Sequence, residues 1–446
     1  MRRWLRRLAL ALVVLVVAQL LVFPHCSGSA LLCRWPGAGR GAAQSAGPRD
    51  ADADRDCSPS GYLKSSRREY WNASAPGAPG LADVLLNGGV VYAVLNLNVA
   101  ARGGGAWHDA TWTFTFEALQ PAQRVAVEGA TFGKDPHEHT LVVFAPLPPA
   151  VYAGGGALRR VRLDARRNNS GDALTYGAVP FCANGDETPR RHLVACTHVL
   201  ASAAPLLPEW IVYHALEQRY EHFYVYINDD HQEELRAVLQ PFVAARLVTI
   251  IDWEWQKQHE GNLVYQQAEE NACLLRARGR AAWVALHDVD EFVQPRAEGV
   301  TLASLAATAP AGQSVLRLQS QWFGVSADAA VQARLDAGSR LVTGRLAAAG
   351  PLLTYVRRKC IVRPERVIYF SVHSVTRGDR HFDVSPVLAR LLHYKQAAYH
   401  NNTYGTLDTS MAAAAARVQE RLDALAAAWP ALRNLGASHN KSHDAG

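Results

Sequence analysis

Short apolar segments alternate with amphipathic helical segments between residues 192 and 286, and this alternation constrains the fold more than any other feature. The expected strands are His192–Leu200, Phe223–Ile227, Leu247–Ile251 and Ala282–Leu286, and the helices between them are Pro208–Arg219, Glu233–Leu239 and Asn262–Gly279. Strands joined by helices predict a mostly parallel sheet with helices packed on it. The sequence therefore predicts an α/β fold here, with ligands at the carboxyl ends of the strands.

A different pattern precedes this region. Between residues 81 and 180, short β-prone runs are separated by Gly and Pro clusters: Val90–Asn96, Thr111–Phe116, Val125–Glu128, Thr140–Phe144 and Leu158–Leu163. This spacing predicts a small β-sandwich-like accessory domain at 81–180. Its aromatic residues Tyr92, Trp107, Trp112 and Tyr152 either stack on sugar rings or fill the core of the domain.

The N-terminal segment indicates the compartment. Four Arg residues within the first seven positions precede an apolar run from Leu8 to Phe23. This pattern predicts a cytosolic tail at 1–7 and a transmembrane signal anchor at 8–24. A cleaved signal peptide is the alternative, because small residues follow at Ser27–Ala30. Residues 25–80, rich in Gly, Ala, Ser and Pro, predict a stem. Either topology places the bulk of the chain in a lumenal or extracellular space.

Composition and cysteine usage exclude several classes of protein. With 49% hydrophobic and 19% charged residues, the chain is not a disordered protein. The net charge of +6 comes largely from the N-terminal Arg residues, which argues against a nucleic-acid binder. The seven cysteines include no CxxC pair, which argues against a zinc site, and their odd number leaves at least one without an intramolecular partner. Glycosylation sequons begin at Asn72, Asn168, Asn401 and Asn440 and fit the same compartment.

The strongest chemical signal is the segment Asp288-Val289-Asp290-Glu291-Phe292, which directly follows an expected strand. In an extended segment, alternate side chains share a face, so Asp288 and Asp290 are expected to point together. Two carboxylates at a strand end are suitable ligands for Mn²⁺ or Mg²⁺. Such a metal ion would hold a nucleotide diphosphate. A solvated turn after a buried strand is the alternative reading.

Between about Arg191 and Lys395, the chain resembles glycosyltransferase family 92. The matching blocks occur in order: ACTHVL, PEWIVYH, HFYVYIN, the long YQQAEENACLLRARGRAAWVALHDVDEFVQP, KCIVRPERVIYFSVHSV and LLHYK. The resemblance implies a GT-A-type nucleotide-sugar-binding domain, assigned here to 186–410, a UDP-galactose donor, Mn²⁺ and inversion at the sugar carbon. It also implies a single-pass type II protein of the Golgi membrane. A C-terminal helix and tail occupy 411–446.

Site residues carried over from the family follow its motifs. Asp288 and Asp290 would form the donor and metal motif, with His373 as a third metal ligand and His393 as its rival. The nucleotide-sugar site would add Thr197, Asn228, Asp229, Lys359 and Arg363 to Asp288. Lys359 and Arg363 would bind diphosphate oxygens, although both also fit a solvated basic face.

The chain departs from the family pattern in three places. Arg219 stands where many relatives have a small residue, and Ile227 stands where they carry an Asp. If that Asp helps to bind the nucleotide, Asn228 or Asp229 would have to do so in this chain. The Ala-rich stretch 325–355, where an acceptor loop would lie, matches poorly. An inverting transfer also needs a base, usually a carboxylate. The sequence offers Glu291, Asp328, Asp379 and Asp383 and does not choose among them.

These features predict a metal-dependent galactosyltransferase that acts on a glycan acceptor of the β-1,4-galactan or N-glycan type. Two alternatives share much of the same evidence. One is a catalytically inactive, lectin-like relative, favoured by the departures at Ile227 and at 325–355. The other is the same class of enzyme with a different UDP-sugar donor.

Overall fold

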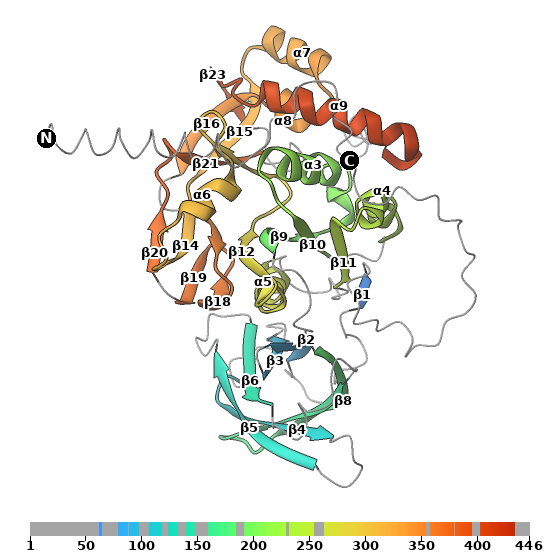
Figure 1. The fold of residues 1–446 in the computed structure, drawn as a ribbon, viewed down its shortest axis with the longest axis vertical. Coiled ribbons are helices and arrows are strands. Elements are labelled where there is room, and N and C mark those ends of the chain that lie inside the picture. Colours follow the sequence, from blue (N-terminus) through green and yellow to red (C-terminus); the bar gives the residue numbers. More distant parts are fainter. Residues whose placement is uncertain are drawn as a thin grey trace, which may run out of the picture. The chain divides into compact units, whose positions relative to one another are not determined.

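The computed structural model describes residues 62–64, 79–87, 89–97, 107–117, 124–132, 140–147, 159–183, 191–228, 232–253, 263–353, 357–378, 380–394 and 402–432. These residues belong to one compact unit that holds a β-barrel and an α/β part (Figure 1). Within them, no helix has the length and apolar character needed to cross a bilayer. The predicted anchor at 8–24 lies outside the described residues.

A closed barrel replaces the expected sandwich. Its strands are β2 (Gly80–Asn87), β3 (Val90–Asn96), β4 (Ala110–Glu117), β5 (Arg124–Phe132), β6 (Thr140–Pro146), β7 (Arg159–Arg167) and β8 (Ala173–Ala183). Their order around the barrel is β2-β3-β6-β5-β4-β7-β8. Neighbouring strands are antiparallel, except that β8 pairs parallel with β2 and so closes the ring. Closure removes the exposed sheet edges that a sandwich would retain.

The barrel interior is filled by alternate side chains. In β4, Trp112, Phe114 and Phe116 are buried, whereas the Thr residues between them point outward. Trp107 lies in the same core. The two tryptophans proposed as sugar-stacking residues are therefore core residues. Tyr92 stacks on Phe144, and its hydroxyl accepts a hydrogen bond from Arg278, so it too has a structural role. Tyr152 lies outside the described residues.

An eight-stranded sheet forms the centre of the α/β part. Its strands, in spatial order, are β1 (Tyr62–Lys64), β11 (Val248–Asp252), β10 (His222–Ile227), β9 (Arg191–Val199), β12 (Ala281–Leu286), β17 (Lys359–Val362), β14 (Gln313–Leu318) and β20 (Arg380–Asp383). Five of its seven strand pairs are parallel. The expected mostly parallel sheet is present, although strand pairing elsewhere in the described residues is mainly antiparallel.

Helices cover both faces of this sheet. The helices are α3 (Leu207–Glu217), α4 (Gln232–Ala244), α5 (Leu263–Ala277), α6 (Leu302–Thr308), α7 (Ala329–Gly338), α8 (Val342–Arg345) and α9 (Ala412–Ala428), with short 3-10 turns η3 (Ala201–Ala203) and η4 (Pro430–Leu432). Trp210 of α3 packs with Ala195 on one face of β9, and Ala272 of α5 packs with Val194 on the other. The predicted C-terminal helix is confirmed, and it packs through Val418 on the α3 side.

A second sheet lies beside the first, and its first strand begins within the DVDEF segment. It consists of β13 (Glu291–Pro295), β21 (Ala389–His393), β15 (Ser320–Ser326), β16 (Ala348–Leu353) and β23 (Thr406–Leu407), with β22 (Thr403–Tyr404) paired to β15. A separate hairpin joins β18 (Val367–Ser371) and β19 (Ser374–Gly378). Both the second sheet and the hairpin contribute residues to the site described below.

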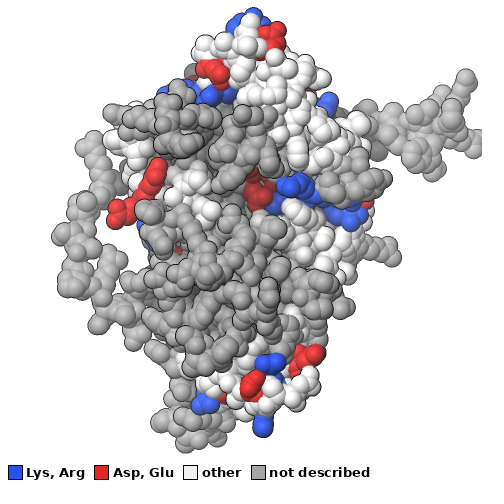
Figure 2. All heavy atoms as spheres, turned by 180° about the vertical axis from the view of Figure 1, so that it is seen from behind, with Lys and Arg blue, Asp and Glu red and all other residues white. Residues whose placement is uncertain are grey.

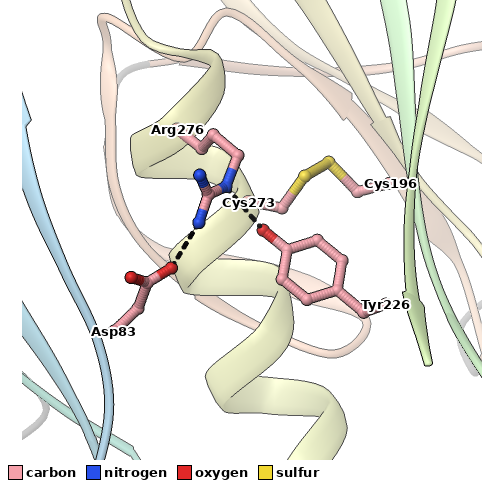
Figure 3. Close-up of a disulfide and its surroundings, with 5 residues drawn as sticks. All are labelled: Asp83, Cys196, Tyr226, Cys273 and Arg276. Atoms are coloured by element: carbon pink, nitrogen blue, oxygen red, sulfur yellow. Dashed lines mark hydrogen bonds and ion pairs between the residues drawn. A yellow bond between two sulfur atoms is a disulfide. The ribbon is translucent and has the colours of Figure 1, made fainter. Parts of the chain in front are cut away.

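The barrel contacts the α/β part through α5. Asp83 of β2 forms a buried ion pair with Arg276 of α5, and Arg276 also donates to the Tyr226 hydroxyl (Figure 3). The same helix is joined to β9 by the disulfide Cys196–Cys273. Helix α5 is therefore held from two sides, by the barrel and by the central sheet.

The departure at Arg219 has a conformational consequence. Arg219 follows α3 and has φ = 63°, in the left-handed region that favours glycine. Glycine, which lacks a Cβ atom, would adopt this φ with less strain than Arg does.

Candidate functional site

The DVDEF segment forms a turn between the two sheets. Strand β12 ends at Leu286, and β13 begins at Glu291. The Glu291 amide donates to the Asp288 carbonyl at 3.1 Å, and the Glu291 carboxylate accepts from the Asp288 amide at 2.9 Å. The expectation of an extended segment is therefore wrong. Because the backbone turns here, the Asp288 and Asp290 side chains have different partners.

Asp288 is held by a buried lysine. The Lys359 ammonium lies 3.1 Å from one Asp288 carboxylate oxygen, and Gln266 donates to the other at 2.6 Å. The Lys359 side chain is only 2% exposed. Burial opposes ionisation of Asp288, but Lys359 and then His393 outweigh it, so the pKa of Asp288 is lowered. This geometry differs from the predicted diphosphate contact of Lys359, because the ammonium is already engaged by a carboxylate.

Asp290 is paired with His393. The His393 Nε2 atom lies 3.3 Å from an Asp290 carboxylate oxygen, and its Nδ1 atom lies 3.7 Å from Glu291. Burial lowers the pKa of His393, but the carboxylate of Asp290 raises it more strongly, to about 9. His393, which the sequence offered as the rival of His373, is thus the imidazole that contacts the second aspartate of the motif.

His373 approaches the site from the β18–β19 hairpin. Helix α5 holds this hairpin, since Asn271 donates to the Phe370 carbonyl at 2.8 Å and accepts from the Phe370 amide at 3.0 Å. Burial and the nearby Lys359 lower the pKa of His373 to about 4, while Asp288 opposes this shift. His373 is therefore a neutral imidazole within the electrostatic reach of Asp288.

Helix α5 also brings buried acids to the site. Glu269 and Glu270 are 1% and 3% exposed, and both interact electrostatically with Asp288 and Lys359. Burial raises the pKa of Glu270 to about 8. Burial also raises the pKa of Glu291, with a further contribution from Asp288, and the opposing effect of Lys359 and His393 leaves the value at about 7. One lysine ammonium thus lies among several carboxyl groups, of which Glu269, Glu270 and Glu291 are buried.

The strand ends complete the site. Thr197 and His198 lie at the carboxyl end of β9, and Asn228 directly follows β10, whose Ile227 pairs with Val199. All three are at the edge of the parallel strands where β12 leads into Asp288. Asp229, the other predicted nucleotide contact, lies outside the described residues.

Several buried polar atoms in the described part of this site have no hydrogen-bond partner, as do others in the β-barrel. Among the described residues, those that interact with Asp288 or its partners include His198 Nε2, Glu269 Oε1, Glu270 Oε2, His373 Nδ1 and His393 Nδ1. Buried polar groups are almost always hydrogen-bonded in folded proteins, because an unmet one costs free energy. Those around Asp288 offer hydrogen-bonding partners to a polar ligand.

Several predicted residues are not brought to this group. Arg363 directly follows β17, at the opposite end from Lys359, and it stacks over Trp283 at 4.3 Å and donates to the Gln313 carbonyl. Of the candidate bases, Asp328 caps α7, and Asp383 pairs with Arg317. Only Glu291 belongs to the site among the described candidates, and its carboxylate closes the turn at Asp288. Asp379 lies outside the described residues.

Sequence reasoning missed Gln266, Glu269, Glu270 and His198. The two glutamates carried a usable signal, because they lie between Ala268 and Ala272, two apolar residues four positions apart on the expected helix Asn262–Gly279. Acidic residues next to such positions are rarely buried without a reason. Gln266 and His198 had no comparable signal, since their roles depend on the proximity of α5, β9 and the turn at Asp288.

The buried acids predict a pH dependence of stability. The folded state keeps a proton on Glu270 up to about pH 8, whereas the unfolded chain loses it near pH 4.5. Since the folded state then binds more protons, its stability falls as pH rises between these values. We expect Glu270→Gln to remove part of this fall. Between pH 5 and pH 8.5, the free energy of unfolding of the variant should decrease by roughly 1–3 kcal/mol less than that of the unaltered chain.

Urea unfolding at the two pH values, with EDTA present, measures this difference. The exposed Glu420→Gln, on α9, is the matched control and is expected to follow the unaltered chain. Parallel pH profiles for Glu270→Gln and the unaltered chain would contradict the assignment.

Acidic and basic side chains meet near the middle of the face drawn in Figure 2. The described residues around Asp288 have the same character, because carboxylates, an ammonium and imidazoles lie within a few ångströms of one another. This combination suits a ligand that carries both negative charge and hydroxyl groups.

Comparison with known proteins gives consistent relatives. A galactan beta-1,4-galactosyltransferase of Arabidopsis thaliana is 34% identical over 92 residues, which are 20% of this chain and 18% of that protein. Another from the same plant is 28% identical over 193 residues, 42% of this chain and 33% of that protein. A glycosyltransferase family 92 protein of Ricinus communis is 31% identical over 98 residues, 22% and 16% of the two chains. Each match thus covers a third or less of the relative's length.

Among solved structures, the galactosyltransferase LgtC in complex with donor and acceptor sugar analogs aligns with 13% identity and a TM-score of 0.22, covering 39% of this chain and 58% of that chain. A similarity of that size supports no conclusion about this chain. The model of "Glycosyltransferase family 92", in contrast, matches residues 191–423, just over half of the chain, and this match includes the strands, the helix α5 and the turn that build the site. The chain belongs to glycosyltransferase family 92.

Proposed function

We propose that this protein is a GT-A-type, inverting glycosyltransferase that moves galactose from UDP-galactose to a glycan acceptor. Membership of the family and the relatives named galactan beta-1,4-galactosyltransferases support the reaction class and the sugar. The acceptor would be of the β-1,4-galactan or N-glycan type.

The observation that carries the proposal is the group of polar side chains at the ends of parallel strands, together with buried polar atoms of the described residues around Asp288 that have no hydrogen-bond partner. Thr197 and His198 lie near the end of β9, Asn228 follows β10, and Asp288 follows β12. Ligands of α/β sheets bind at this edge. A nucleoside diphosphate sugar has phosphate, ribose and sugar oxygens, which would satisfy the donors and acceptors that the protein leaves open.

The chemistry of the donor atoms fits a divalent metal ion. Within the described residues, no three His, Cys, Asp or Glu side chains form a preformed metal cluster. Magnesium-type sites, however, commonly use one or two carboxylates and take further oxygens from the substrate phosphates. Asp288 and Asp290 would supply the carboxylates, and His393 or His373 an imidazole, which suits Mn²⁺ better than Mg²⁺. When bound, the metal ion would neutralise the charge of the diphosphate leaving group.

The chain's own residues would act mainly by positioning. Lys359 holds the Asp288 carboxylate in its ionised form, and Gln266 fixes its orientation. His393 Nε2 contacts the Asp290 carboxylate and so helps to fix its position. Since these partners are fixed by β17, α5 and β21, the two carboxylates are arranged before a substrate arrives. Such preorganisation lowers the cost of reaching the transition state.

We also propose that the protein acts in the Golgi lumen as a type II membrane protein. The apolar run at 8–24 and the disulfide Cys196–Cys273 support this location, because disulfides persist in oxidising compartments. Cys360 is a buried free cysteine.

The test is turnover of a panel of UDP-sugars by the chain from the stem onward, with Mn²⁺ or EDTA. We expect turnover of UDP-galactose with a short β-1,4-galactan or an N-glycan, a loss of at least about tenfold with EDTA, and recovery with added Mn²⁺. The barrel should be retained, since it contacts α5. Glycan binding without binding of any UDP-sugar would contradict the proposal and identify a lectin-like relative, and undiminished turnover in EDTA would contradict the metal.

A further inference from the structure

Three side chains of the second sheet form a row across its strands. His393 of β21 pairs with Glu291 of β13 on one side and with Trp322 of β15 on the other. Residues directly opposite each other on neighbouring strands point to the same face of a sheet. Glu291, His393 and Trp322 therefore share one face.

This face is the face of the site. Residues adjacent to these three along the strands, Phe292, Leu392 and Phe323, are buried in the hydrophobic core behind the sheet. Because side chains alternate along a strand, Glu291 and His393 point away from that core. Trp322 lies where the register between β15 and β16 shifts, and it is partly exposed whereas Phe323 is buried. The contacts of His393 with Asp290 and Glu291 show where it points, which is toward the carboxylates of the DVDEF turn.

The Trp322 ring is partly open to solvent. It is only half-buried, unlike Trp107, Trp112, Trp210 and Trp283, which are almost fully buried. The Arg357 guanidinium lies over its ring at 5.9 Å, near the outer limit of a cation–π contact. Arg357 is exposed and also interacts electrostatically with His373. Guanidinium groups also lie over Trp107 and Trp283, so the Trp322 ring differs from those by its exposure to solvent.

A half-open indole beside carboxylates and an imidazole suits a sugar ring. A pyranose has apolar C–H groups on its faces and hydroxyl groups at its edge. The indole offers an apolar face to the C–H groups, and the neighbouring polar groups offer hydrogen-bond partners to the hydroxyl groups. The nucleotide-side residues Thr197 and Asn228 lie at the ends of β9 and β10, in the other sheet. Trp322 lies on β15, on the opposite side of His393 from Glu291.

We propose that Trp322 is the stacking platform for the terminal sugar ring of the acceptor glycan. The inference rests on the glycosyl transfer proposed above and adds a specificity-determining residue to it. It also places the acceptor against β15, directly before the Ala-rich stretch 325–355 that matches the family poorly.

Kinetics of Trp322→Ala and Trp322→Phe, measured against acceptor and donor separately, test this assignment. We expect the acceptor KM to rise about tenfold in Trp322→Ala, as for the loss of a large apolar contact, and to rise less in Trp322→Phe. The KM for UDP-galactose and the slow transfer of galactose to water should remain unchanged, because neither needs the acceptor. Trp429→Ala, which removes a half-buried tryptophan beyond α9, is the matched control.

The outcomes separate this inference from the function on which it rests. Loss of acceptor affinity with intact donor hydrolysis supports the platform. An unchanged acceptor KM in folded Trp322→Ala, or a parallel fall of hydrolysis and transfer, would overturn it while leaving the reaction in place. If Trp322→Ala does not fold, the KM of Trp322→Phe decides in the same way. Absence of both transfer and hydrolysis in the unaltered protein contradicts the glycosyl transfer itself.

Discussion

Asp290→Asn is expected to reduce galactose transfer by about 10²–10³-fold, the range seen when a group that stabilises the transition state is removed. The substitution preserves shape but removes the carboxylate charge that faces His393. It also removes one of the two carboxylates proposed to bind the metal ion. Folding should be retained, because the backbone contact of this residue, from the Tyr394 amide to the Asp290 carbonyl at 2.8 Å, does not involve the side chain.

The measurement is kcat with saturating UDP-galactose and acceptor, together with the thermal unfolding midpoint of each variant. Asp423→Asn provides the control, because Asp423 is an exposed aspartate of α9 that pairs with Arg340 away from the site. It should retain the activity of the unaltered chain. If Asp290→Asn turns over as fast as the unaltered chain, the DVDEF turn is not the site of the reaction.

Much of the α/β part could be predicted because its signals are local. The strands β9, β10, β11 and β12 were expected within one or two residues of their bounds, since each is a short apolar run bounded by clear helix signals. Asp288 was expected at a strand end for the same reason. These predictions depend on residues that are close together in the sequence.

Other features depend on contacts between distant segments. The β-prone runs gave no sign that β8 would pair with β2, about a hundred residues earlier, and so close a barrel. His393 was preferred over His373 only once β21 was paired with β13. Lys359 and Arg363 looked equivalent in the sequence, but a strand of four residues places them roughly 13 Å apart. In each case the missing information was strand register, which composition and periodicity do not contain.

Asp83→Ala is expected to lower the free energy of unfolding by about 3–5 kcal/mol, because it leaves a buried charge without its partner. Asp83 and Arg276 are both 7% exposed. Burial disfavours the charge of Arg276, but Asp83 outweighs this effect, so the pKa of Arg276 is raised, and Arg276 stays charged in either case. The exposed pair Arg167–Asp172, on the barrel, gives a control, since Asp172→Ala should cost less than about 1 kcal/mol.

The double variant Asp83→Ala with Arg276→Met distinguishes loss of the pair from loss of a contact. Replacing both charges with apolar groups should restore most of the stability, because no unpaired charge remains in the contact between the barrel and α5. Urea unfolding of the four chains measures this cycle. Galactose transfer should follow stability, since α5 carries Gln266 and the two buried glutamates to Asp288. A change below about 1 kcal/mol for Asp83→Ala, or no recovery in the double variant, would show that the barrel does not hold this helix through its ion pair.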